Sequence, residues 1–372
     1  MPTHITKITE SSLKFLLGIK LRQLRTAQGL KIKELSEKSG VSMSYLTEIE
    51  KGKKYPKPDK ITAIADALGV AYADLTSTEL DRRLKPFATL LNSNILDELP
   101  LEHFGVDIGK LLEFFTAAPD KIGAFLQTLI DLVRLHEMDI HQFYFSSLRA
   151  YQELTNNYLE EVEVAAEAFL EDVETVKVDN LADRLTQKYG VTLDETLLTD
   201  YPELNDIRSV WLPHQDKKLA LNPKLNTPQK TFILARELAF HELKLDPRPT
   251  TFSYVKPESF ELILNNYKAS YFAGAILLPR RQLVQDLNKL FAQDVWNESQ
   301  FRALLSKYQA SPEMLLHRLT SLAPKFLGLK SLFFLRFSDA KTENTFKITK
   351  ELHLDRLHTP HANRQHEHYC RR

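Results

Sequence analysis

A series of short helical segments that end at glycines is the feature that most constrains the fold of the first 75 residues. Leu17, Leu21 and Leu24 recur with helical spacing before Gly29, and the next three segments end at Gly40, Gly52 and Gly69. The third segment begins at Ser42, a residue type that caps helix N-termini. Short helices joined by glycine-containing turns are typical of a helix-turn-helix bundle. We therefore predict a flexible tail over 1–12 and such a bundle over 13–78.

The charge of the chain is divided between its two ends. The whole sequence has 49 Lys and Arg and 49 Asp and Glu, so its formal net charge is zero. Residues 1–78 carry thirteen basic and eight acidic side chains, a net charge of +5 that leaves −5 for the remainder. Because positive charge concentrated in one domain attracts polyanions, we expect the N-terminal part to bind an anion.

Cysteine content and hydropathy restrict the cellular compartment. The lone cysteine, Cys370, excludes an internal disulfide framework and a cysteine-based zinc module, which favours a reducing environment. The N-terminus lacks the apolar core of a signal peptide, and no apolar run approaches the roughly 18 residues that a membrane helix needs. We therefore expect a cytoplasmic protein that does not associate with membranes.

The rest of the chain is predicted to be helical at first and mixed later. Helices are expected over 111–138 and, as one long segment, over 143–173. Two strands, SVWL and KLAL, then flank a polar turn within 208–221, and helices are predicted over 227–243, 258–278, 299–308 and 312–322. The run SLFFLRF at 331–337 predicts a buried strand, with KTENTFKI as its hairpin partner. The predicted fold class is mainly α with a small β component.

Residues 18–70 resemble the Cro/repressor-type (XRE) helix-turn-helix family along their whole length. Their apolar positions, their glycines and the EKGK turn before a proline fall where that family has them. The resemblance implies a five-helix bundle that binds a double-stranded DNA operator, with an ion pair between Arg25 and Glu50. The third helix would lie in the major groove, where short polar side chains read base edges and lysines neutralise phosphates. The DNA-binding residues implied in this way are Lys33, Ser42, Met43, Ser44, Thr47, Glu48, Lys51, Lys53 and Lys54.

Residues 205–283 resemble the ImmA/IrrE-type metallopeptidase-like family, through two strands, a helix containing TFILARELAF and a second helix reaching YFAGAILLP. Active relatives carry a His-Glu-x-x-His motif, which places two imidazoles on a zinc ion, and a third ligand from the next helix. Here Arg236, Glu237 and Phe240 stand at the motif positions, and Lys268 stands at the third ligand. Because two cations and a phenyl ring cannot coordinate zinc, we expect a metal-free α+β zincin-like domain with no cofactor and no peptidase activity.

Those four residues are therefore candidates for another role. A frame shifted to His241 and Glu242 places Leu245 at the partner position and offers only one imidazole. Cations at former ligand positions suit a carboxylate or a phosphate, so Arg236, Glu237, Phe240 and Lys268 are predicted to bind a ligand. Since unpaired charges are costly to bury, either such a ligand or an internal Arg–Glu pair must satisfy them, and both alternatives remain open.

The combination of the two domains resembles the short-chain fatty acyl transcriptional regulator family, with RAYQELTNNYLEEVE before and SPEMLLHRLTSLAPKFLGLKSLFFLRF after the peptidase-like part. The resemblance implies a homodimeric regulator that senses an acyl-CoA or a fatty-acid-type metabolite. We accordingly expect a helical linker, for dimerisation or ligand binding, over 79–176, the peptidase-like domain over 177–290, and a C-terminal region over 291–372 that is incomplete in this chain. Two alternatives are a zinc-dependent peptidase that cleaves a partner regulator and an antitoxin-like interaction module.

Overall fold

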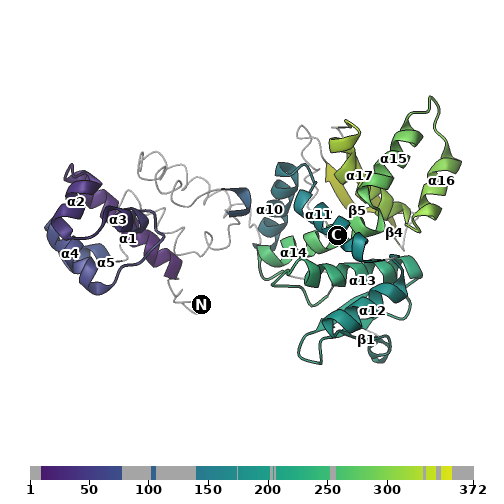
Figure 1. Ribbon diagram of the computed structural model, residues 1–372, viewed down its shortest axis with the longest axis horizontal. Helices are drawn as coiled ribbons and strands as arrows, with labels where there is room; N and C mark the ends of the chain where they lie inside the picture. Colours follow the sequence, from purple (N-terminus) through teal and green to yellow (C-terminus); the bar gives the residue numbers. More distant parts are fainter. Residues whose placement is uncertain are drawn as a thin grey trace. The chain divides into compact units, whose positions relative to one another are not determined.

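The chain forms two compact units, Met1–Asp139 and Ile140–Arg372. The computed structural model describes residues 10–77, 102–105, 140–173, 175–201, 204, 207–251, 257–329, 332–340 and 345–353, and Figure 1 labels most of their helices and strands. These residues are mostly helical and include a small sheet, which confirms the predicted fold class. The helix expected over 111–138 lies outside the described residues.

The first unit contains the five predicted helices. They are α1 (Glu10–Ala27), α2 (Ile32–Ser39), α3 (Met43–Glu50), α4 (Pro58–Leu68) and α5 (Tyr72–Thr76). Ser42 caps α3, because its hydroxyl oxygen accepts a hydrogen bond from the Tyr45 amide at 3.3 Å. Gly40 and Gly69 end α2 and α4 in the left-handed conformation, which glycine adopts without a steric penalty.

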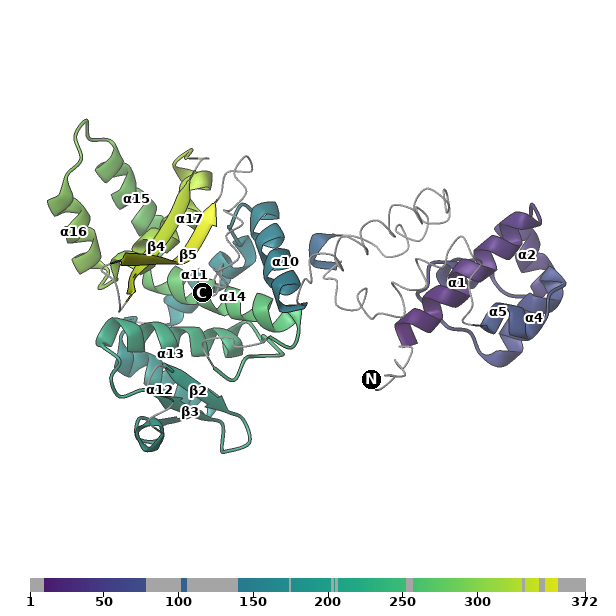
Figure 2. The same cartoon turned by 180° about the vertical axis from the view of Figure 1, so that it is seen from behind.

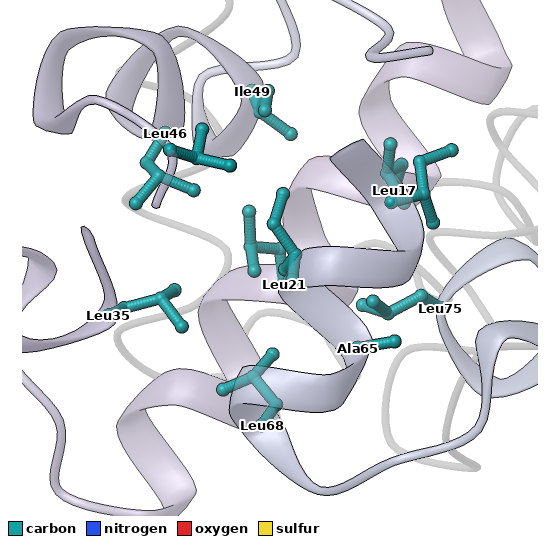
Figure 3. Packing of buried hydrophobic residues seen from close by; sticks show 11 residues of the cluster. Leu17, Leu21, Leu35, Leu46, Ile49, Ala65, Leu68 and Leu75 are labelled. Atoms are coloured by element: carbon teal, nitrogen blue, oxygen red, sulfur yellow. The ribbon is translucent and has the colours of Figure 1, made fainter. Parts of the chain in front are cut away.

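One apolar cluster holds these five helices together, and Figure 3 shows its side chains gathered between them. Leu21 of α1, Leu46 and Ile49 of α3 and Leu75 of α5 are all almost fully buried. The backbones of α1 and α3 approach closely at Gly18, where a Cβ atom would overlap the carbonyl oxygen of Ile49. The cluster therefore fixes α3 against α1 and leaves the opposite side of α3 exposed.

The second unit is built around two long helices, α13 (Thr227–Glu242) and α14 (Phe260–Leu277), which lie side by side in Figures 1 and 2. Helices α10 (Ile140–Leu154) and α11 (Glu160–Asp172) pack on α14, and α12 (Val178–Tyr189) packs on α13. A three-stranded sheet has the order β1 (Thr192–Asp194), β3 (Lys218–Leu221), β2 (Ser209–Leu212). Strands β2 and β3 are the predicted SVWL and KLAL, and they pair antiparallel.

The single helical segment expected over 143–173 is wrong. The chain turns between α10 and α11, where Asn156 and Asn157 adopt φ values of 51° and 53°. Asparagine tolerates this left-handed conformation better than most residues, so the two asparagines break the helix without a glycine.

The remaining elements follow α14. They are α15 (Arg280–Phe291), α16 (Glu298–Lys307), α17 (Pro312–Phe326), and the antiparallel hairpin of β4 (Phe333–Ala340) and β5 (Thr345–His353). The hairpin confirms the predicted strand pair, but β4 is not buried as expected, since Phe333 is 67% and Phe337 53% exposed. Among the side chains of β4 that the structure describes, Phe334 is buried and packs against the His317 ring of α17.

No helix in the described part of the chain combines the length and the hydropathy that crossing a lipid bilayer requires.

Candidate functional site

The exposed side of α3 carries most of the residues predicted to bind DNA. Met43 and Ser44 are exposed, and Thr47 and Glu48 are half-buried. The Thr47 hydroxyl donates a hydrogen bond to the Met43 carbonyl at 2.7 Å, so its methyl group and its oxygen lone pairs remain for an outside partner. The structure thus brings short polar side chains together on one helix face. The hydroxyl oxygen of Ser42 serves as the helix cap instead.

Lysines lie at the margins of this face. Lys53 and Lys54 are exposed and Lys51 is half-buried after α3, while Lys33 is exposed on α2. The Lys54 ammonium lies 3.0 Å from a Glu48 carboxylate oxygen, and both side chains are largely solvated. Exposed pairs of this kind contribute little to folding stability, so Lys54 can exchange its carboxylate partner for a phosphate.

The ion pair implied by the helix-turn-helix resemblance is present. The Arg25 guanidinium donates from Nε and Nη2 to the two Glu50 oxygens, at 2.6 and 2.9 Å, and from Nη1 to the Leu30 carbonyl at 2.7 Å. The hydrogen bonds to Glu50 raise the pKa of Arg25 above its ordinary value. This bidentate pair holds the end of α1 against the end of α3 and so orients the exposed face.

Three of the four residues at the zinc-motif positions are buried on α13. Arg236 is 3%, Glu237 1% and Phe240 4% exposed, whereas Lys268 is half-buried on α14. The Arg236 guanidinium donates from Nε to the Asn266 side-chain oxygen at 3.0 Å and again from Nη2, and it lies over the Phe240 ring. Asn266 is therefore a hydrogen-bond partner of the buried Arg236 guanidinium, which the sequence did not predict.

Glu237 forms an internal ion pair, but its cation is Arg248 and not Arg236. Arg248 Nη2 lies 2.5 Å from Glu237 Oε2, and His241 Nε2 lies 3.6 Å from Glu237 Oε1. Burial on its own raises the pKa of Glu237, but His241 and Arg248 together hold the pKa of this carboxyl below its ordinary value. The Arg248 guanidinium is also stacked between the Trp211 and Phe240 rings, at 4.0 and 4.4 Å from their centroids.

This cluster does not fit a zinc ion. Arg236 and Phe240 offer no lone pair, and the carboxylate of Glu237 already contacts a guanidinium. Within the described residues, no group of three or more His, Cys, Asp and Glu side chains is arranged to hold a metal. Those residues likewise offer no hydrogen-bond partner to Glu237 Oε1, His241 Nε2 or Arg248 Nε.

A separate cavity of about 330 Å³ lies between α13, α14 and α17. Its outer end is formed by the first turns of two helices, where Asn226 caps α13 and Ser311 caps α17, together with Arg208. Helix N-termini and arginine side chains favour anions. Glu313, in the first turn of α17, also lines this end, so its charge is mixed. Phe232, Met314 and the apolar part of the Tyr271 ring line the walls, so the cavity suits a ligand with a polar and an apolar part.

Gly274 opens this cavity. A Cβ atom added there would meet nothing within 4 Å, although the residue lies inside α14 and lines the cavity. Glycine in a helix interior costs roughly 0.5–1 kcal/mol relative to alanine, so its presence beside empty space is unfavourable for folding alone. Sequence reasoning missed this cavity, and the glycine within the helical run YFAGAILL was the signal that pointed to it.

Two family models match the chain. The helix-turn-helix model matches residues 21–75, and the model of the IrrE N-terminal-like domain matches residues 201–320. The first range covers α1 from Leu21 through most of α5, and the second contains β2, β3, α13 and α14.

Curated proteins with similar sequences are transcriptional regulators. The propionyl-CoA carboxylase regulator of Cereibacter sphaeroides is 26% identical over 344 residues, which cover 88% of this chain and 70% of that protein. The HTH-type transcriptional regulator RamB of Mycobacterium tuberculosis is 25% identical over 345 residues, covering 86% and 68%. An uncharacterized HTH-type regulator of Sinorhizobium fredii, y4dJ, is 32% identical over 65 residues, covering 18% of this chain and 84% of the relative.

Proposed function

This chain belongs to the XRE-type helix-turn-helix regulators that carry an IrrE-like domain, and we propose that it adjusts transcription in response to an acyl-CoA or a related acyl metabolite. Its DNA-binding surface is the exposed face of α3 with the lysines that follow it. The observation that carries the ligand-sensing part of the proposal is the cavity at Gly274, which has apolar side walls and a polar outer end at the N-termini of α13 and α17.

The chemistry of the cavity matches an acyl thioester. An acyl chain would lie along Phe232, Met314 and Gly274, while the polar remainder of the ligand would meet Arg208 and the two helix N-termini. At about 330 Å³ the cavity is at the small end of ligand sites, so it takes an acyl group and leaves the nucleotide of coenzyme A outside. A relative named for the regulation of a propionyl-CoA-consuming enzyme supports the same ligand class.

We place the acyl group in this cavity and not among the residues at the zinc-motif positions. There the Arg236 guanidinium already donates to Asn266, and Glu237 already pairs with Arg248. Binding of an anionic group by Arg236 and Lys268, which the sequence predicts, is the alternative to this placement, and the variant Arg236→Ala distinguishes the two. The homodimer also stays a prediction; it would bind two half-sites about one helical turn of DNA apart.

The test is calorimetric titration of the full chain with propionyl-CoA and butanoyl-CoA, combined with thermal unfolding. Ligand at a hundredfold excess over Kd should stabilise the chain by about 2.7 kcal/mol. The variant Gly274→Leu places a side chain in the empty space and improves helix propensity, so it should fold at least as well while losing the heat of binding. Arg236→Ala should bind as wild type does.

Two results would contradict the proposal. One is the absence of binding heat and of stabilisation with either acyl-CoA. The other is a folded Gly274→Leu protein that binds acyl-CoA with wild-type affinity. If only Arg236→Ala lost binding, the ligand class would stand and the site would move to the contact between α13 and α14.

A further inference from the structure

The inner end of the cavity is closed by charged and polar side chains, not by apolar ones. Exposure falls along the cavity-lining face of α17, from exposed Pro312 to Arg318 and Ser321, which are each 3% exposed. Tyr271, on the opposite wall, is 7% exposed. A ligand entering from the solvent side would therefore reach Tyr271 and Arg318 last.

Arg318 is held in place by three hydrogen bonds. Its Nη1 and Nη2 donate to the two Glu163 oxygens at 2.6 and 2.9 Å, and its Nε donates to the Leu278 carbonyl at 3.2 Å. Burial on its own lowers the pKa of Arg318, but the pair with Glu163 raises the pKa above its ordinary value, so the guanidinium stays charged. The Tyr271 hydroxyl donates to the same carboxylate at 2.7 Å and accepts a hydrogen bond from the Leu159 amide.

These three residues stand between two cavities. Tyr271 and Arg318 line the cavity at Gly274, whereas Glu163 of α11 lines a second cavity of about 360 Å³ beside the start of α15. The second cavity has a polar lining that includes Glu167 and Arg280. The hydrogen-bonded group of Arg318, Glu163 and Tyr271 is therefore a wall, and each of its members is satisfied by the others.

We propose that the wall of Arg318, Glu163 and Tyr271 sets the longest acyl chain that the cavity at Gly274 accepts. An alkyl chain offers no hydrogen bond, so passing the wall would separate a buried ion pair and leave two charges unpaired. That loss exceeds what the burial of further methylene groups returns. The inference rests on the proposed function, and it names the residues that limit the length of the bound acyl chain.

The experiment measures affinity against chain length, from acetyl-CoA to dodecanoyl-CoA, by titration of the full chain. Affinity should rise about fourfold with each methylene that the cavity buries and then fall once the chain meets the wall. The double variant Glu163→Gln, Arg318→Met removes both charges together, keeps an acceptor for the Tyr271 hydroxyl, and leaves the new amide in contact with the polar second cavity. In this variant, affinity should begin to fall only at a longer acyl chain. The shortest acyl-CoA that the wild-type chain rejects should bind at least about tenfold more tightly.

The matched control variant changes another ion pair between α11 and α17. Lys325 of α17 and Glu160 of α11 form an exposed pair at 2.7 Å that lines neither cavity. The variant Glu160→Gln, Lys325→Met should therefore leave the chain-length profile unchanged. A second variant acts in the opposite direction: Gly274 lies one helical turn from Tyr271, so Gly274→Ala should shift the profile to shorter chains.

The outcomes separate this inference from the proposed function. An affinity that keeps rising through dodecanoyl-CoA in the wild-type chain, or an unchanged profile in the folded wall variant, would overturn the wall while leaving acyl-CoA sensing intact. If the wall variant does not fold, the chain-length profiles of the wild-type chain and of Gly274→Ala test the inference. Identical profiles in these two proteins would overturn the wall. Absence of binding for every acyl-CoA would remove the proposed effector and the wall together.

Discussion

A single carbon atom has opposite consequences at two helical glycines of this chain. At Gly18 an added Cβ overlaps the Ile49 carbonyl oxygen, which belongs to the backbone and cannot move aside cheaply, whereas at Gly274 it meets empty space. We predict that Gly18→Ala destabilises the first unit by about 1–3 kcal/mol, as overpacking does. Gly274→Ala should stabilise the second unit by about 0.5–1 kcal/mol. Amide hydrogen exchange in the full chain, followed separately in α1 and α14, measures both, and equal signs would contradict the account.

The buried carboxylate of Glu237 makes stability depend on acid pH. Its pKa lies below the ordinary value when the chain is folded, so its contribution to the free energy of unfolding is complete above the unfolded-state pKa of about 4.3. That contribution is lost as the pH falls through the folded-state pKa. Glu237→Gln should lower stability at neutral pH and show a weaker loss below pH ~4.3. Urea unfolding at several pH values checks this, and parallel curves for the two proteins would contradict it.

Zinc content tests the interpretation of the residues at the zinc-motif positions. Because Arg236 and Phe240 offer no metal ligand, purified protein should contain no stoichiometric zinc, and a chelator should leave its melting temperature unchanged. Elemental analysis and thermal unfolding with and without chelator measure this. One equivalent of zinc whose removal lowers the melting temperature would revive the peptidase alternative.

Some residue contacts were predictable and others were not. The pair of Arg25 and Glu50 was foreseen because the helix-turn-helix pattern fixes both positions. Arg248 was missed as the partner of Glu237, since it lies in a loop outside any periodic pattern. Glu163 and Arg318 are 155 residues apart, and no local signal links them before the fold is known.

At the scale of elements, several strands and helices were predicted to within a residue or two, although α17 extends four residues beyond its predicted end. Two short apolar runs around a polar turn gave β2 and β3, and the predicted starts of α13 and α17, at 227 and 312, agree with the structure. Helix α15 was missed because it starts directly after Pro279, which was interpreted only as a helix end. Helix α12 was missed because it buries only two leucines, Leu181 and Leu185.

The turn between α10 and α11 yields a prediction at the same scale. Asn157 has a φ of 53°, donates to Thr320 and Ser321, and accepts a hydrogen bond from the Tyr267 hydroxyl at 2.8 Å. Asn157→Gly loses the side-chain hydrogen bonds but adopts the positive φ without strain. Asn157→Ala loses the same hydrogen bonds and is also strained at this φ. The alanine variant should therefore be less stable than the glycine variant by about 1 kcal/mol, measured by urea unfolding. A glycine variant that is equally or less stable would contradict this.

For the whole molecule, we propose that a basic DNA-binding unit is coupled to a second unit whose cavity binds an acyl group. The division of charge predicted that the first unit binds an anion, the helix-turn-helix resemblance identified that anion as DNA, and the resemblance to the short-chain fatty acyl regulators predicted the second role. The cavity itself is assembled from α13, α14 and α17, which only the tertiary structure brings together. The location of the cavity could therefore not be predicted from the sequence.

The most direct measurement is the affinity of the full chain for its selected operator DNA, with and without saturating propionyl-CoA, by fluorescence anisotropy. Coupled sites typically change each other's affinity by at least about fivefold, so we predict a change of that size in the wild-type chain and none in Gly274→Leu. Lys53→Ala with Lys54→Ala should weaken DNA binding under both conditions and leave the response to ligand intact. An operator affinity that is the same with and without propionyl-CoA, or a wild-type response in Gly274→Leu, would contradict the account.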